Sequence, residues 1–377
     1  MYKKIEGVNE VAKKRSSDFT LFLTVLILVV IGIIMVFSSS HYYALSKMND
    51  SYHFLKRELM WAGLGMIGMF FTMNYDYWKY RKMAPYAYIF SLILLLLIFT
   101  PLGKEINGAR RWLGVGGFTI MPGEVSKICA IIFMASMLSR RTEKIKSFVN
   151  GVIPCLVIIG IYFGLIILQP NMSTAVTISM IIASMMFVAG MRWFHVMAMG
   201  IGGIGFLAVM ILIAPYRMKR LTSFLDPFSD PRGAGYQVIQ SLYALGSGGL
   251  FGVGLGKSIQ KYLYIPEPQN DFIFAIIGEE LGFIGCVTVI LLFLLLIWRG
   301  VRISINAPDL FSCLLASGIT AMVAVQVIIN IAVATSSMPV TGIALPFISW
   351  GGNSLAIFMA AMGILLNISR HSNLDRR

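Results

Sequence analysis

The stretch YIPEPQNDFIFAIIGEELGFIG, residues 264–285, runs from a proline-stiffened polar loop into an apolar segment, and Asp271 stands at the junction. An aspartate in this position could cap the helix that follows, since its carboxylate accepts backbone N–H bonds. Glu279 and Glu280 lie within the apolar run. A buried acid in a membrane segment is costly, so each of these carboxylates marks a candidate functional site.

An unbroken helix through this stretch would carry a face of small residues below Asp271, which lets another helix approach closely. The members of this face lie within about 40° of Asp271 around the helix axis and are Ala275, Gly278, Gly282 and Gly285. Glu279 would lie about 80° from this face and about 12 Å deeper, and Glu280 would point to the opposite side. We therefore interpret Asp271 as the acid at the mouth of a site and the two glutamates as internal structural supports.

The composition is that of a membrane protein. Of the 377 residues, 57% are hydrophobic and 13% are charged, which excludes a soluble domain built around one core. The net charge of +14 could suggest nucleic acid, but the basic residues are spread over loops between apolar runs, which favours membrane anchoring and anionic lipid. No nucleic-acid partner is therefore expected. The four cysteines lie in apolar segments without metal-ligand spacing, so we expect neither disulfides nor a cysteine-bound metal.

The apolar runs predict an all-α polytopic membrane protein with about ten transmembrane helices. They fall near residues 19–40, 58–74, 84–101, 122–139, 149–168, 173–190, 193–215, 271–298, 309–335 and 343–369. We expect a single membrane domain over residues 19–369, with tails at residues 1–18 and 370–377. A large extracytoplasmic loop, residues 216–270, separates the seventh helix from the eighth.

The distribution of positive charge predicts the orientation of the helices. The short connections at residues 79–82 and 140–146 are rich in Lys and Arg, and such segments stay in the cytoplasm. Both termini are then cytoplasmic, and the loops at residues 102–123 and 216–270 face outward. The segment 336–354 contains two prolines and a glycine pair. Irregular backbone of this kind is tolerated at membrane depth where protein buries it or where it lines a cavity.

The outward loops carry cations that could bind an anionic group, because Arg binds phosphate bidentately and Lys binds it as a point charge. The substrate-binding candidates are Arg110, Arg111, Trp112, Lys127, Arg217, Lys257 and Lys261, and Arg220 belongs to the same pool. The Arg-Arg-Trp run is equally typical of an anchor at the membrane interface. Glu124 precedes Lys127 by one helical turn and could pair with it, so we interpret Glu124 as a further structural support.

Several ordered motifs resemble the SEDS (shape, elongation, division and sporulation) family, and the resemblance covers nearly the whole chain. The motifs are NGARRWL at 107–113, PGEVSK at 122–127, QPNMST at 169–174, GYQ at 235–237, PEPQNDFIFA at 266–275 with GEELG at 278–282, and PVTGIALPFISWGG at 339–352. The chain is most similar to the FtsW and SpoVE branch. It departs from the family pattern at Asn171, where the family often has Asp, and at Trp350 and Asn353, where it often has Tyr and Ser.

The resemblance implies a peptidoglycan glycosyltransferase that polymerises lipid II at the outer face of the bacterial cytoplasmic membrane. The implied partners are a class B penicillin-binding protein, which is a transpeptidase, and other division or sporulation membrane proteins. The family's catalytic aspartate corresponds to Asp271. A carboxylate there can act as the general base for the attacking sugar hydroxyl.

The leaving group in this reaction is a lipid diphosphate, so its developing charge needs cations nearby. Arg111, Lys127 and Lys257 are our first choices for this role. A divalent cation, Mg²⁺ or Mn²⁺, could share the work, although the sequence contains no carboxylate cluster that demonstrates a metal site, and no cofactor is certain.

Two other classes of function stay open. A lipid II flippase, which moves the same precursor between leaflets, would also use many spans, intramembrane acids and broken segments. The concentration of polar residues in the outward loops favours the enzyme, because a flippase needs matching contacts on both sides of the membrane. A scaffold that recruits division or spore-coat machinery would still function with Asp271 neutralised.

Overall fold

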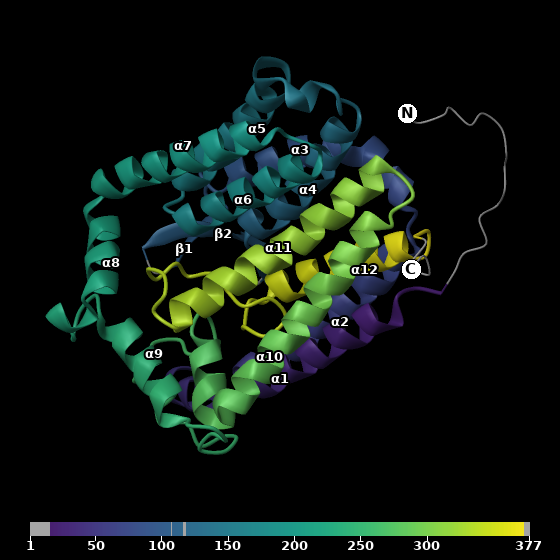
Figure 1. Ribbon diagram of the computed structural model, residues 1–377. Coiled ribbons are helices and arrows are strands. Elements are labelled where there is room, and N and C mark those ends of the chain that lie inside the picture. The colour runs from purple at the N-terminus through teal and green to yellow at the C-terminus, as the bar shows by residue number, and fades with distance from the viewer. Residues whose placement is uncertain (1–15, 107, 116–117, 373–377) are drawn as a thin grey trace.

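The structure is a computed structural model that describes residues 16–106, 108–115 and 118–372. Long helices run side by side in a bundle, and a small sheet and shorter helices lie toward one end of it (Figure 1). Most of the two predicted tails, residues 1–15 and 373–377, lies outside the described residues, and so does Asn107 of the NGARRWL motif.

Ten helices of the described chain occupy the positions of the ten predicted spans. They are α1 (Phe19–Met48), α2 (His53–Asn74), α3 (Tyr77–Leu97), α4 (Pro122–Ser139), α5 (Ile153–Ile167), α6 (Met172–Val188), α7 (Trp193–Leu212), α10 (Ile273–Ile305), α11 (Leu310–Ala334) and α12 (Asn353–Ser369). A 3₁₀ turn (Lys144–Lys146) and a π-helical turn (Phe148–Val152) precede α5. By length and composition, seven helices of the described residues can cross a membrane, and α6 and α12 are shorter apolar helices. The multi-pass helical fold is therefore confirmed, and the count of ten stays a prediction.

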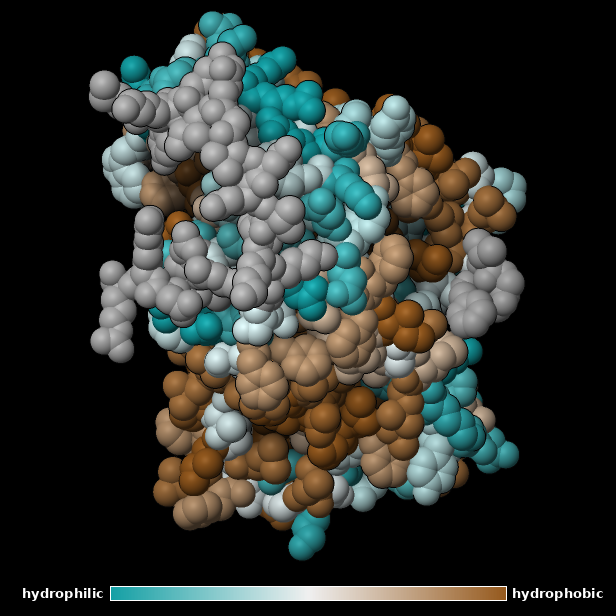
Figure 2. All heavy atoms as spheres, turned by 90° about the vertical axis from the view of Figure 1, so that its right-hand side faces the viewer, coloured by the Kyte–Doolittle hydropathy of each residue, from teal (hydrophilic) through white to brown (hydrophobic). Residues whose placement is uncertain are grey.

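Apolar surface covers the sides of the bundle. Figure 2 shows one face on which a broad hydrophobic area adjoins a hydrophilic one. On α7 the side chains of Phe194 and Ile204 are 77% and 72% exposed. Soluble monomers rarely expose contiguous apolar patches of this kind, and lipid is the environment that suits them.

A three-stranded antiparallel sheet, which the sequence analysis did not predict, lies between α3 and α4. Its strands are β1 (Gly103–Ile106), β2 (Ala109–Val115) and β3 (Phe118–Ile120), in the order β1-β2-β3. Alternate residues of a strand share a face, so Arg111 lies on the same side of β2 as Ala109 and Leu113, which are both buried. The sheet thus turns Arg111 toward the helices.

The long outward loop is partly helical. It contains α8 (Pro215–Leu225), a 3₁₀ turn (Pro227–Ser229) and α9 (Tyr236–Ser247). The hydroxyl of Ser241 donates to the carbonyl of Ala334 at 2.7 Å, which fastens α9 to the end of α11.

The first and last described segments meet at one end of the bundle. The carboxylate of Asp18 accepts from the amide of Leu21 and so caps α1. It also pairs with Arg299 of α10, with an N–O distance of 2.5 Å. The backbone amide of Asp18 donates to the hydroxyl of Ser369 at the end of α12. The first and last helices of the described chain therefore start and finish on the same side of the bundle.

Helix α10 differs from the unbroken helix that we predicted. It begins at Ile273, with Phe272 at the N-cap position and no side-chain cap. The predicted cap by Asp271 is therefore wrong. Inside the helix, Gly282 has a φ of 67° and a ψ of −165°, a conformation that only glycine adopts readily. This break rotates Gly285 relative to the first turns, so the predicted continuous face of small residues is also wrong.

The segment at residues 249–254 supplies hydrogen-bond partners to the backbone groups at the break in α10. A break leaves backbone groups on both sides without helical partners, and buried backbone groups need partners. Four backbone hydrogen bonds supply them: Val253 to Glu279 (2.9 Å), Gly254 to Glu280 (3.1 Å), Phe283 to Gly249 (2.9 Å) and Ile284 to Leu250 (3.2 Å). The outward loop is thereby fixed to the helix that follows Asp271.

Candidate active site

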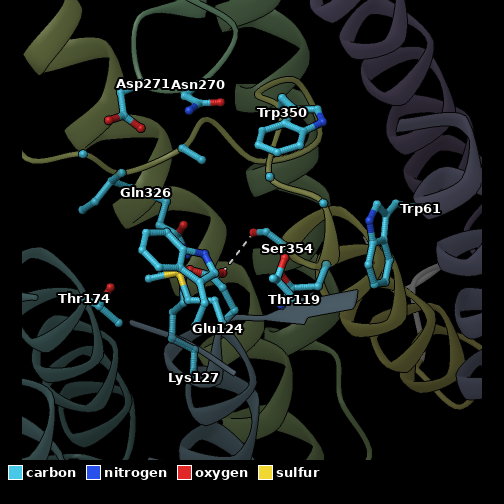
Figure 3. A pocket seen from close by; sticks show the side chains of 18 of the residues that line it. Trp61, Thr119, Glu124, Lys127, Thr174, Asn270, Asp271, Gln326, Trp350 and Ser354 are labelled. Atoms are coloured by element: carbon cyan, nitrogen blue, oxygen red, sulfur yellow. Dashed lines mark hydrogen bonds and ion pairs between the residues drawn. The ribbon is translucent and has the colours of Figure 1, made fainter. Parts of the chain in front are cut away.

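A cleft opens at the end of the bundle opposite Asp18 and Ser369. Its lining comes from α2, α4, α6, α11 and the start of α12, from the sheet, and from the two irregular segments at residues 270–271 and 342–352. Figure 3 shows Asp271 at one edge of this cleft and Lys127 at its floor. The cleft therefore joins segments that lie far apart in the sequence.

Asp271 lies at the boundary of the cleft and a second cavity. Arg220, Gln237 and Glu267 contribute to the lining of the second cavity. Asp271 and Gly342 line both spaces. A carboxylate placed in this way can contact groups that enter from either side.

The irregular segment after α11 fixes the surroundings of Asp271. The side-chain Nδ2 of Asn330 donates to the carbonyl of Asp271 (2.9 Å) and to the carbonyl of Ile343 (2.8 Å). Gly342 has a φ of +74°, and a Cβ atom there would lie 3.3 Å from Oδ2 of Asp271. Glycine at this position thus lets the backbone of the irregular segment pass directly beside the carboxylate.

The surroundings of Asp271 make it a stronger base than a free aspartate. Burial and the nearby charge of Glu267 raise its pKa to about 6, while Arg220 and Arg111 act in the opposite direction. A carboxylate with this pKa is mostly ionised at neutral pH and still accepts protons well. General bases are most effective when their pKa lies near the working pH.

Arg111 and Arg220 are held close to Asp271 by backbone carbonyls. The guanidinium of Arg111 donates to the carbonyls of Gln169 and Pro170, and that of Arg220 donates to the carbonyl of Val340 at 3.2 Å. Burial and the charge of Arg220 lower the pKa of Arg111. Two fixed cations therefore flank the carboxylate, as stabilisation of a developing negative charge requires.

Glu124 and Lys127 form a buried ion pair at the floor of the cleft. Their side-chain N–O distance is 2.7 Å, and the hydroxyl of Ser354 donates to the other carboxylate oxygen at 3.0 Å. The ammonium group also lies 5.6 Å from the ring centroid of Phe358. The predicted pairing one turn apart is confirmed. The pair leaves the floor with little net charge.

The remaining predicted cations lie away from the two cavities. Arg110 is exposed and pairs with Glu105 at 3.5 Å. Arg217 donates to the carbonyl of Met210 at 2.8 Å, and Lys257 lines neither cavity. Of the predicted binding residues, the structure brings Trp112 and Lys127 into the cleft and Arg111 close to Asp271.

Lys261, Glu279 and Glu280 belong to a buried network behind the cleft. Lys261 pairs with Glu280 at 2.9 Å, and the hydroxyl of Ser38 donates to Glu280 at 2.6 Å. Glu279 accepts from the amide of Ile259 at 2.8 Å. The ammonium of Lys261 belongs to this network and lines neither cavity. The role of the two glutamates as structural supports stays a prediction.

The sequence analysis missed several residues of the site. Asn330 and Gln326 are polar residues within the apolar helix α11, and a polar residue inside a span is itself a signal of function. Arg57 and Trp61 of α2 also line the cleft, but single residues near the start of a helix carry no such signal. Among the described residues, no group of three or more His, Cys, Asp or Glu could hold a metal ion.

The fold and the cleft define a multi-pass helical membrane protein with a carboxylate and two fixed arginines at one end of its bundle. The chain matches the family of FtsW, RodA and SpoVE, described as cell cycle protein, over residues 19–374. It belongs to this family. Our assignment to the SEDS family from the motifs is therefore confirmed.

Curated relatives cover almost the full chain. Stage V sporulation protein E of Bacillus subtilis (strain 168) is 49% identical over 361 residues, which are 96% of this chain and 99% of that protein. The probable peptidoglycan glycosyltransferase FtsW of Geobacter sp. (strain M18) is 40% identical over 353 residues, which are 93% of this chain and 96% of that protein.

Solved structures are similar over the same extent. One similar chain comes from a structure described as "Structural coordination of polymerization and crosslinking by a peptidoglycan synthase complex". Its TM-score is 0.79 and its sequence identity is 30%, and the match covers 95% of this chain and 98% of that chain. The rod shape determining protein RodA of Thermus thermophilus has a TM-score of 0.71 and 27% identity, with 97% and 99% covered.

Proposed function

We propose that this protein is a peptidoglycan glycosyltransferase that polymerises lipid II into glycan strands, with Asp271 as the general base. The observation that carries this proposal is the position of Asp271 between two cavities, with Arg111 and Arg220 beside it. A polymerase must bring two lipid-linked units to one base. The names of the FtsW relatives support the same activity.

The chemistry follows from this arrangement. The carboxylate of Asp271 takes the proton from a sugar hydroxyl of one unit, and the hydroxyl oxygen attacks the anomeric carbon of the other unit. A new glycosidic C–O bond forms while the C–O bond to the lipid diphosphate breaks, and its electron pair leaves with the diphosphate. Attack opposite the leaving group inverts the anomeric carbon. Arg111 and Arg220 stabilise the charge that develops on the diphosphate.

The proposed orientation places the cleft at the outer face of the cytoplasmic membrane and both termini in the cytoplasm. Asp18 and Ser369 meet on one side of the bundle, and the cleft opens on the other. Charge in the short connections supports the termini as the cytoplasmic side. We also propose a class B penicillin-binding protein as partner, because the similar synthase complex is described as coordinating polymerization with crosslinking.

A lipid II flippase is the alternative, and its requirements fit the structure less well. Both cavities that contain Asp271 lie at one end of the bundle. Near the other end, the cavity beside Arg141 and Ile145 has a volume of about 220 Å³, which is too small for a lipid-linked disaccharide. A flippase needs contacts for its cargo on both sides.

The experiment that tests this proposal uses purified protein, with its candidate transpeptidase, fed labelled lipid II. Products are separated on a gel that resolves glycan chain length, and vesicles that contain the protein are assayed in parallel for lipid II transfer between leaflets. We expect a ladder of glycan chains and no transfer. Transfer without a ladder in the presence of the partner would establish the flippase instead.

A further inference from the structure

A basic turn connects α4 to α5 at the end of the bundle opposite the cleft. Helix α4 lines the cleft with its first turns, so its last residues, and the turn at residues 140–152 that follows them, lie at the far end. Lys146 of this turn pairs with Glu143 at 3.2 Å. Its other cations are exposed and have no ion-pair partner among the described residues, and they are Arg140, Arg141 and Lys144. The turn therefore carries uncompensated positive charge.

The backbone of this turn is held in one shape by packing. Ile145 is 1% exposed and fixes the middle of the turn to the bundle. The amide of Ser147 donates to the carbonyl of Lys144 at 3.0 Å. Gly151 packs against the same carbonyl, and a Cβ atom at Gly151 would collide with it. Because the backbone is already fixed, little order is lost when the cations on its outer surface bind an anion.

The start of α7 lies beside this turn and adds a cation and two aromatic rings. Phe148 of the turn contacts His195 of α7, with ring centroids 5.5 Å apart. Arg192 is the N-cap residue of α7 and is exposed. Trp193 and Phe194 follow it and are 66% and 77% exposed. Exposed aromatic residues next to basic ones are typical of the boundary between the tails and the headgroups of a bilayer.

Helix α7 is packed lightly against the rest of the bundle. Of its 20 residues, only His195 is buried. Further along the helix, Phe206 contacts Phe163 of α5, with ring centroids 5.2 Å apart. Figure 1 shows α7 at the edge of the bundle. A helix that buries so little apolar surface gains little stability from packing. A ligand that joins the start of α7 to the basic turn therefore adds a large share of what holds this helix in place.

We propose that the turn at residues 140–148 and the start of α7 together bind the headgroup of an anionic phospholipid, and that the bound lipid fastens α7 to the bundle. Arg141 and Lys144 on one side and Arg192 on the other bind the phosphodiester, since arginine and lysine are the side chains that suit phosphate. The exposed rings beside Arg192 contact the acyl chains. An acidic soluble peptide would satisfy the cations but leave these rings in water. The proposed orientation places the site in the cytoplasmic leaflet, whose anionic lipids attract basic segments.

Quenching by brominated lipids measures the lipid preference of the site. The full chain is placed in phosphatidylcholine bilayers that contain increasing fractions of phosphatidylglycerol with brominated tails, which quench nearby tryptophan fluorescence. The difference between wild type and Trp193→Phe isolates the signal of Trp193, and brominated phosphatidylcholine is the reference. We expect a preference for phosphatidylglycerol that falls about fivefold for each cation removed and disappears in the triple variant Arg141→Gln, Lys144→Gln, Arg192→Gln. Equal quenching of wild-type Trp193 by the two lipids would overturn the proposal.

A matched triple variant separates a site from a general attraction of the basic protein to anionic lipid. Lys47→Gln, Lys104→Gln and Lys257→Gln remove three exposed cations at the other end of the bundle. This variant should keep the full preference at Trp193, and an equal loss of preference in both triple variants would contradict a localised site. Soluble glycerol phosphate is added to the same bilayers as a competitor. Relief of the quenching would show that the cations bind a free phosphate and not a lipid.

Hydrogen exchange tests whether the lipid fastens α7. The wild-type protein and the first triple variant are compared in mild detergent with and without phosphatidylglycerol, and α11 is the internal reference because most of it is buried. We expect the lipid to slow amide exchange in α7 of the wild type by several-fold and to leave α7 of the variant and α11 of both proteins unchanged. Unchanged exchange in wild-type α7 on addition of the lipid would contradict this role.

Discussion

The side-chain amide of Asn330 donates a 2.9 Å hydrogen bond to the backbone carbonyl of Asp271, 59 positions earlier in the chain. The same nitrogen donates to Ile343 at 2.8 Å. One side chain of α11 therefore ties together the segment that carries Asp271 and the irregular segment that passes beside it. Asp271 lies outside regular secondary structure and caps no helix, so these hydrogen bonds of Asn330 fix its position.

Replacement of Asn330 by Leu should lower both stability and catalysis. Two buried carbonyls lose their donor, at a cost of about 1–3 kcal/mol each, and a displaced base loses more than about tenfold in kcat. A suitable control is Asn367→Leu, because Asn367 makes comparable bonds to Met73 and Tyr77 at the other end of the bundle. Melting temperature and kcat are measured for both. Equal losses of kcat in the two variants would contradict a positioning role for Asn330.

The pH dependence of polymerisation should report the ionisation of Asp271. Because the base acts in its ionised form, kcat/KM should fall as pH drops through about 6, the pKa of Asp271. Glu267→Gln removes a negative charge that raises this pKa, so the acid limb should move to lower pH. Arg220→Ala removes a positive charge that lowers it, so the limb should move to higher pH. Initial rates of all three proteins are measured from about two pH units below this pKa to about two above it. An acid limb that does not move in the variants, or moves in the opposite direction, would refute Asp271 as the general base.

The buried Glu124–Lys127 ion pair predicts that a second substitution restores the stability lost by the first. Lys127→Met leaves Glu124 as an unpaired buried charge, which typically costs about 3–5 kcal/mol, so the melting temperature should fall. The double variant Lys127→Met with Glu124→Gln removes both charges, and the amide oxygen that replaces the carboxylate can still accept from Ser354. Its melting temperature should return close to that of wild type. A double variant no more stable than the single one would show that the pair is not coupled.

Gly282 is required by the break in α10. Its φ of +67° is strained for any side chain, and a Cβ atom there would collide with the backbone of Leu250 and Gly252. We expect Gly282→Ala to lower the melting temperature sharply and to detach the segment at residues 249–254. Gly160→Ala is the matched control, since open space surrounds Gly160. Limited proteolysis within residues 249–261 would detect the detachment, and an unchanged digestion pattern would contradict it.

The sequence was sufficient for features that depend on local pattern. Apolar runs located the membrane helices, and the spacing of Glu124 and Lys127 predicted their pair. Asp271 was singled out by its position at the start of an apolar run. These features follow from hydrophobicity and helical geometry, which act over a few residues.

Long-range pairing accounts for what the sequence could not provide. A basic residue can lie near Asp271 or near a different acid. Which of these it contacts depends on how segments far apart in the sequence pack together. Arg220 reaches the neighbourhood of Asp271, while Lys261 is bound to Glu280 and Ser38. The break at Gly282 was equally hidden, because it is stabilised by backbone bonds to a segment about thirty residues earlier.

The stability of the Asp271→Asn variant must be known before its loss of activity can be interpreted. The pKa of Asp271 is raised from 3.8 to about 6 in the folded protein, so the folded state binds this proton more tightly than the unfolded chain does. The resulting stabilisation is fully present below about pH 4 and is lost as pH rises through about 6. Asn carries no charge at any of these pH values. Asp271→Asn should therefore be at least as stable as wild type at mildly alkaline pH.

The most direct test of the account compares wild type and Asp271→Asn, both purified with the partner transpeptidase and fed labelled lipid II at mildly alkaline pH. Chain length is resolved on a gel, and the melting temperature of each protein is recorded on the same preparation. We expect a glycan ladder from wild type and none from a fully folded Asp271→Asn protein. A normal ladder from that folded variant would show that Asp271 is not the base.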